Sequence, residues 1–370
     1  MIDDTPDTPE SRLPTMQQIA DLAGVSLMTV SRALKNHPHQ SVETRTRIQK
    51  IATELGYRPN PMVSALMAHL RSSKAAARPR GSPVIAFLTS HTEKHVFVEG
   101  ETYLGAIFAG ASRRAATLGY KLERFSLVEP HMNGARMGRM LRARGILGVI
   151  LAPLPDPIPV VDFDWTPFAC ATVGYSYKEV LLHRSVNDQF SSMRLAMSRL
   201  HALGYQRVGL AIRHEDDSRT EGKWTGAFWS FHSSLPEARR MPIFLWHEWR
   251  PTGFDKWVNT HRPDAVITLH ADVRDWLRKL GKHPPRNIGL VSLNIQGDQA
   301  TFSGIDQNNA IIGGTAVELV VEQIHHNEHG VPARAKTVMI MGDWVEGATT
   351  RRQKPPKRPT VPAPAATPVE

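Results

Sequence analysis

The chain has 370 residues, of which 41% are hydrophobic, so it is long enough for two or three domains and a large core. Its formal net charge is +10. Its one cysteine, Cys170, excludes a disulfide framework and a cysteine-rich zinc site. No stretch has the length of a membrane span and no secretory signal opens the chain, so we expect a cytoplasmic protein with no membrane partner.

Positive charge is concentrated toward the two ends of the chain. Residues 11–80 hold 11 Lys or Arg against three acidic residues, and residues 351–358 add five more, while residues 81–350 sum to only +2. A phosphate-binding module needs such a local excess, and its affinity falls steeply with salt. Basic runs are usually solvated faces, so the charge supports nucleic-acid binding without proving it.

The segment of residues 14–34 predicts two short helices joined by a tight turn. Thr15 can cap the first helix, Gly24 supplies the left-handed turn, and Ser26 can cap the second helix. A recognition helix presents its early and outward residues to base edges in the major groove. Here those residues are Leu27, Met28, Thr29, Ser31 and Arg32. The pattern favours a DNA-binding helix-turn-helix over an ordinary helical hairpin.

A third amphipathic helix is predicted over residues 41–55, with Ser41 as its cap. Its apolar residues are expected to face the core: Val42, Ile48, Ile51 and Leu55. An extended connector follows because Pro59 disfavours helical geometry before it. Asn60 can then cap a fourth helix over residues 61–71.

The stretches AGVSLMTVSRAL and VETRTRIQKIATELGYRPN together resemble the DNA-binding headpiece of the LacI family of bacterial transcriptional regulators, the lactose- and purine-repressor-like proteins. The resemblance implies that residues 60–71 form a hinge helix on operator DNA and that Leu66 wedges into the minor groove. The usual alanine-arginine-serine-leucine is Val63-Ser-Ala-Leu66 here, so one arginine contact to the DNA backbone is missing. The expected DNA contacts are Thr15, Ser26, Leu27, Met28, Thr29, Ser31, Arg32, Asn36, Tyr57, Asn60 and Leu66.

The chain is expected to divide into a disordered N-terminus (1–13), the headpiece (14–59), the hinge (60–71), a linker (72–82), a core (83–350) and a disordered, basic, proline-rich tail (351–370). In the core, strands are predicted at 83–89, 120–126, 146–152, 168–173, 208–212, 243–246, 265–268 and 288–292. Helices are predicted near 102–118, 135–144, 190–203, 222–234, 254–260, 271–280 and 309–327. This alternation implies two doubly wound parallel-sheet subdomains with a cleft between them. The expected fold is an all-α headpiece plus an α/β core like that of periplasmic binding proteins.

Ligands of such sheets bind at the carboxyl ends of the strands. Lys223 stands where sugar-binding members of the family carry an arginine, with Arg219 one turn upstream as a substitute, and Trp249 falls where an aromatic ring often stacks on a sugar. The resemblance assigns the effector to Asn187, Asp188, Arg219, Lys223, Trp249, His270 and Asn294. Three departures from the family's polar set leave the effector open, with a carbohydrate as one option. For any one of these residues, helix capping or loop bonding is an equally good explanation.

We therefore expect a sequence-specific transcriptional regulator, with repression favoured over activation. It would bind a pseudo-palindromic operator as a homodimer under the control of a small-molecule effector. A periplasmic solute-binding protein is the first alternative, which the headpiece argues against. An enzyme is the second, but the 17 histidines are scattered, and Gly313-Gly314 lacks the Lys-Ser/Thr of a phosphate loop. We predict no metal and no cofactor, and the choice between dimer and tetramer stays open.

Overall fold

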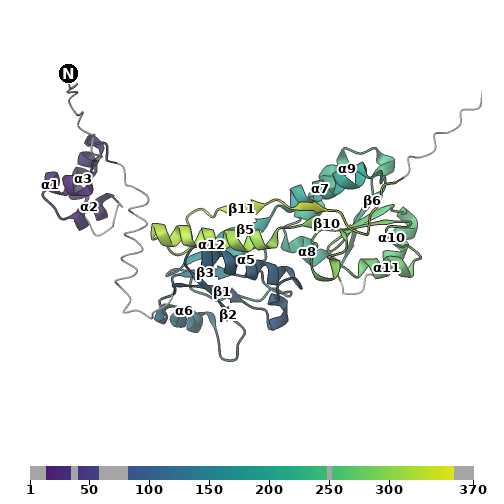
Figure 1. The fold of residues 1–370 in the computed structure, drawn as a ribbon, viewed down its shortest axis with the longest axis horizontal. Coiled ribbons are helices and arrows are strands. Elements are labelled where there is room, and N and C mark those ends of the chain that lie inside the picture. The colour runs from purple at the N-terminus through teal and green to yellow at the C-terminus, as the bar shows by residue number, and fades with distance from the viewer. Residues whose placement is uncertain (1–13, 35–40, 58–81, 248–251, 354–370) are drawn as a thin grey trace, which may run out of the picture. The chain divides into compact units, whose positions relative to one another are not determined.

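The computed structural model describes residues 14–34, 41–57, 82–247 and 252–353 (Figure 1). The chain divides into two compact units, the headpiece within residues 1–77 and the core within residues 78–370. The predicted hinge helix and both predicted disordered ends lie outside the described residues, apart from residues 351–353. So do four predicted site residues, Asn36, Asn60, Leu66 and Trp249. Within the described ranges, no helix is long and apolar enough to cross a membrane.

The headpiece contains the three predicted helices, α1 (Met16–Ala23), α2 (Leu27–Leu34) and α3 (Val42–Glu54). Thr15 forms a capping box with Gln18, and Gly24 ends α1 in the left-handed conformation at φ 65°. Ser26 Oγ accepts the Thr29 N–H at 3.2 Å and so caps α2. These contacts confirm the turn between the two helices and both of their predicted caps.

The three helices share a small apolar core made of Ile19, Ala20, Ala23, Val30, Ala33, Ile48 and Ala52. The prediction that Val42 and Leu55 face this core is wrong, because they are 67% and 37% exposed. Val42 stands six positions before Ile48, which turns it roughly 240° around the helix from the buried face. Leu55 is the C-cap residue, where the helix has already ended.

The core unit is built on two six-stranded sheets, in the order β11-β5-β4-β3-β1-β2 and β12-β10-β9-β8-β6-β7. The first contains β1 (Val84–Thr89), β2 (Lys121–Ser126), β3 (Gly148–Leu151), β4 (Ala169–Val173), β5 (His183–Asn187) and β11 (Thr337–Ile340). The second contains β6 (Val208–Arg213), β7 (Phe244–Trp246), β8 (Ala265–Thr268), β9 (Gly289–Ser292), β10 (Ser303–Asp306) and β12 (Asp343–Val345). Paired strands run parallel except β10 and β12. The predicted pair of doubly wound α/β subdomains is therefore confirmed.

Helices cover both faces of each sheet, and we call each sheet with its helices a half of the core. The first half carries α5 (Tyr103–Thr117), α6 (Gly134–Ala143) and α12 (Asn309–His326). The second half carries α7 (Gln189–Ala202), α8 (His214–Arg219), α9 (Lys223–Ser233), α10 (Phe254–His261) and α11 (Val273–Lys279). Among its described residues the core also contains three short 3₁₀ helices: η1 (Lys94–Phe97), η2 (Glu237–Arg239) and η3 (Gly297–Gln299).

The chain passes between the halves three times, after β5, after β10 and after β11 (Figure 1). The three crossing segments are bonded to one another. The Asp188 N–H donates to Ile340 O at 2.8 Å, and Asn308 Nδ2 donates to Met341 O at 3.0 Å and to Asp343 Oδ2 at 2.8 Å. The two halves are thus joined by three connecting segments that are hydrogen-bonded to one another.

Several short elements escaped the sequence analysis, among them α8, β5, β10, β11 and β12. Strand β5 reads His-Arg-Ser-Val-Asn, a polar sequence, yet all five of its residues are buried. The predicted tail also begins too early at residue 351. The Gln353 N–H donates to Leu203 O at 2.7 Å and the Arg351 N–H to the Tyr205 hydroxyl at 3.1 Å, so residues 351–353 belong to the core.

Candidate DNA interface and ligand cleft

Helix α2 presents the side chains that the sequence analysis assigned to base recognition. Leu27 and Met28 are 45% and 63% exposed although both are apolar, and Arg32 is exposed as well. Thr29 and Ser31 are half-buried between this surface and the core. The exposed apolar side chains can contact thymine methyl groups, and the arginine can contact the edge of a guanine.

The headpiece holds α2 in place through α3. Arg47 Nη2 donates to Ala23 O at 3.1 Å and Gln49 Nε2 to Ala33 O at 3.0 Å, so α3 contacts the carboxyl ends of both α1 and α2. Tyr57 packs half-buried against the same core, and this burial raises the pKa of its hydroxyl. Because Thr15 and Ser26 accept helix N–H groups, their hydroxyls serve first as caps.

A cavity of about 540 Å³ lies between the two halves of the core, where the carboxyl ends of their parallel strands meet. Its wall includes Tyr103, Tyr175 and Asn187 from the first half and Arg219, His270 and Asn294 from the second. We call this cavity the cleft. Its volume lies within the range of small-molecule sites.

Four of the predicted ligand residues line the cleft: Asn187, Arg219, His270 and Asn294. Asp188 and Lys223 lie elsewhere. Asp188 caps α7 by accepting the Ser191 N–H at 2.9 Å. Lys223 Nζ pairs with the Glu221 carboxylate and lies 4.0 Å from the centre of the Tyr175 ring.

The cleft also contains five amide side chains that the sequence analysis did not select: Gln189, Gln296, Gln299, Gln307 and Asn309. Gln189 is only 7% exposed, and its Oε1 has no hydrogen-bond partner among the described residues. The Oε1 of Gln299 is likewise buried without a described partner. For two of the five, the position in the chain is a signal. Gln189 lies two residues after the end of β5, and Gln307 directly follows β10.

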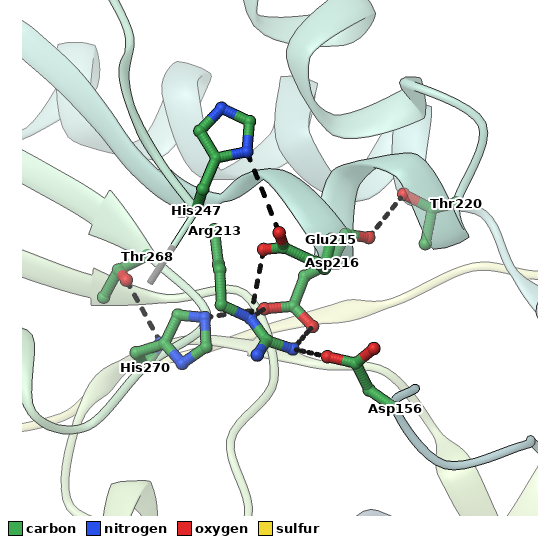
Figure 2. A network of polar contacts seen from close by, with 8 residues as sticks. All are labelled: Asp156, Arg213, Glu215, Asp216, Thr220, His247, Thr268 and His270. Carbon is green, nitrogen blue, oxygen red and sulfur yellow. Dashed lines mark hydrogen bonds and ion pairs between the residues drawn. The ribbon is translucent and has the colours of Figure 1, made fainter. Parts of the chain in front are cut away.

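A charged network stands at one wall of the cleft (Figure 2). Arg213, at the end of β6, is 6% exposed. Its guanidinium binds both carboxylate oxygens of Asp216 at 3.1 and 3.2 Å, and its Nη2 reaches Asp156 Oδ2 at 2.9 Å. His270 Nε2 lies 2.8 Å from Asp216 Oδ2. Burial raises the pKa of Asp216, but the hydrogen bonds from His270 and Arg213 outweigh it and hold that pKa below its usual value.

Comparison with known proteins identifies the family of the headpiece. Residues 15–60 match the model of the bacterial regulatory proteins of the lacI family. The HTH-type transcriptional regulator CelR of Thermobifida fusca is 24% identical over 208 residues, which are 55% of this chain and 57% of that regulator. Residues 15–60 therefore form a LacI-family DNA-binding headpiece. The chain spans about half the length of the first curated LacI-family relatives that it matches.

Solved structures of LacI-family regulators share the fold. The transcriptional regulator CelR–cellobiose complex has a TM-score of 0.52 at 18% identity, over 91% of this chain and 99% of that chain. The lac repressor dimer bound to operator and the anti-inducer ONPF has a TM-score of 0.52 at 18% identity, over 92% and 100%. Both matches extend through the headpiece and the two-sheet core. Within the described parts of the chain, no group of three or more His, Cys, Asp or Glu side chains is arranged to hold a metal ion.

Proposed function

We propose that this chain is a LacI-family transcriptional regulator that binds a pseudo-palindromic operator as a homodimer in the cytoplasm. The observation that carries the proposal is the surface of α2, where Leu27, Met28 and Arg32 are exposed on a helix fixed by its neighbours. The solved lac repressor dimer, which has the same fold, is bound to operator. Repression is the favoured mode of control. Residues 60–71 would form the hinge helix and insert Leu66 into the minor groove.

Arg32→Ala tests the recognition helix. The operator is first selected from a random DNA library with the full-length protein, and affinities are then measured on it and on every single-base variant. The substitution should cost about 1–3 kcal/mol on the selected site and relax the preference at one base position in each half-site, because a bidentate arginine–guanine contact is lost.

Lys50→Ala is the matched control, since Lys50 is an exposed cation of the same headpiece on α3. Its removal should change the affinity for all sequences by one common factor, or leave it unchanged. If Arg32→Ala also weakened all sequences by one factor, Arg32 would be a phosphate contact and the base assignment would be wrong.

We propose further that a carbohydrate binds in the cleft and controls the regulator. Amide side chains both donate to and accept from hydroxyl groups, and the cleft holds seven of them, two of which have buried oxygens without described partners. Tyr103 and Tyr175 supply aromatic surface for the apolar face of a sugar ring. The solved CelR complex, with the same fold, contains cellobiose.

Gln189→Leu tests the cleft. We expect calorimetry of the full-length protein against mono- and disaccharides to find a ligand, and this variant to bind it about 5- to 150-fold more weakly, because a buried hydroxyl loses its acceptor. Lys256→Ala, at an exposed position of α10 outside the cleft, should bind within twofold of the parent protein. A ligand that binds Gln189→Leu and the parent equally well would contradict the assignment.

A further inference from the structure

The two halves of the core contact each other along one edge of the cleft through charged side chains. Asp156 follows β3 of the first half, and Arg213 ends β6 of the second. Their side chains form an ion pair with Nη2 and Oδ2 at 2.9 Å (Figure 2). Beside this pair, Lys178 Nζ of the first half donates to Ser218 O of the second at 3.1 Å. This edge is therefore closed by contacts that opening the cleft would break.

The Arg213–Asp156 pair is well placed to contribute to closure. The side chain of Arg213 is 7% exposed and that of Asp156 is 32% exposed, so solvent screens the pair less than it screens a surface ion pair. Asp216, in the same half as Arg213, holds the guanidinium with two hydrogen bonds. Because the guanidinium is already positioned, pairing with Asp156 costs little further side-chain entropy.

We propose that the Arg213–Asp156 pair is a latch that holds the cleft closed in the absence of ligand, and that Asp216 couples this latch to the ligand site. His270 lines the cleft and contacts the carboxylate that positions Arg213. A molecule that contacts His270 therefore acts on the latch through Asp216, which bonds both His270 and Arg213. The latch itself is independent of the proposed regulatory function, whereas its consequence for operator affinity rests on that function.

Asp156→Asn removes the charge that Arg213 meets across the cleft and leaves Arg213 paired with Asp216. Glu215→Gln is the matched control. It removes the same charge from a carboxylate 3.7 Å from Arg213 Nε, but within the same half. The readout is amide hydrogen exchange of the ligand-free full-length chain, with strand β1 in the first half as the reference for general destabilisation.

In Asp156→Asn, exchange of residues 214–223 should accelerate roughly fivefold, because the open form becomes that much more populated. Exchange in β1 should not change, and Glu215→Gln should stay within twofold of the parent at both places. Unchanged exchange at 214–223 in Asp156→Asn overturns the proposal. So does an equal acceleration in Glu215→Gln, or one that β1 shares.

A distance measurement shows whether the faster exchange is an opening of the cleft. Spin labels on Arg139→Cys in α6 and Lys256→Cys in α10 report the separation of the halves, and the native Cys170 is buried. With labelled chains diluted into unlabelled ones, Asp156→Lys should shift the distance distribution away from the parent's, while Glu215→Gln should reproduce the parent's. A distribution that Asp156→Lys leaves unchanged overturns the proposal. No step uses DNA, so failure of the latch and failure of the regulatory function are distinguishable.

Discussion

Gly313→Ala is expected to destabilise the core by about 2–4 kcal/mol, although the same substitution one residue later should be tolerated. A Cβ at Gly313 of α12 would lie 2.0 Å from Ile107 O of α5, so two helix backbones would have to separate. Overpacking of this kind outweighs the gain of about 1 kcal/mol that alanine brings to a helix. The measurement is urea unfolding followed by circular dichroism.

Gly314→Ala is the control for this prediction. A Cβ there would meet Arg114 Cβ at 3.4 Å, an ordinary contact that a side chain can accommodate. We expect this variant to be as stable as the parent or slightly more stable. Equal losses in the two variants would mean that helix flexibility, and not the α5–α12 contact, explains the paired glycines.

Stability of the second half is expected to fall by about 3 kcal/mol as the pH drops from about 6.5 to about 4. His232 is fully buried in α9, and burial first, followed by the charges of His201 and Arg240, lowers its pKa to about 4. Between these two pH values His232 is protonated in the unfolded chain but neutral in the folded chain. The free energy of unfolding therefore decreases as the pH falls. Above pH 6.5 the group is neutral in both states and contributes no pH dependence.

His232→Gln should flatten the dependence of unfolding free energy on pH over this window, as measured by urea unfolding at a series of pH values. The Met241 N–H donates to His232 Nδ1 at 3.4 Å, and an amide oxygen can replace that acceptor. His95→Gln, at a side chain that is 68% exposed, should keep the parent's slope. A parent protein whose stability is constant from pH 6.5 to 4 would contradict the buried neutral histidine.

The headpiece could be predicted almost entirely from sequence because its signals are local. Thr15, Gly24 and Ser26 act on their own helices, and the structure places all three as the caps and turn require. The prediction that Val42 is buried is wrong because Val42 is the first residue of α3 and lies outside the small core of the headpiece. Apolar character alone does not show how far a small core extends.

The core could be predicted as alternating strands and helices, but not in its connections. Strand β5 was missed because it is polar, and two of its residues bond to distant parts of the chain: His183 Nδ1 accepts the Lys336 N–H at 2.9 Å, and Asn187 Nδ2 donates to Ile340 O at 3.2 Å. At Gly313, α12 approaches α5 of the first half so closely that a Cβ would meet Ile107 O, and the sequence did not reveal this contact. In the sequence, the Gly313-Gly314 pair bears only on a phosphate loop, whose Lys-Ser/Thr is missing.

Side-chain direction limited the prediction of the cleft. Lys223 was selected by its position relative to a family motif, yet its ammonium turns to Glu221 and the Tyr175 ring. Gln189 was overlooked although it directly follows Asn187 and Asp188. Which of three successive residues faces a cavity depends on the turn from strand to helix, and here Asp188 is used as the cap of α7.

We propose that a ligand in the cleft and the operator on the headpiece change each other's affinity for this one chain. The most direct test measures the dissociation constant of the calorimetrically identified ligand with and without the selected operator, and that of the operator with and without the ligand. Both constants should change by one common factor, in the range of about 5- to 150-fold, because coupling between two sites is reciprocal. A ligand that occupies the cleft and leaves the operator affinity unchanged would contradict the proposed coupling.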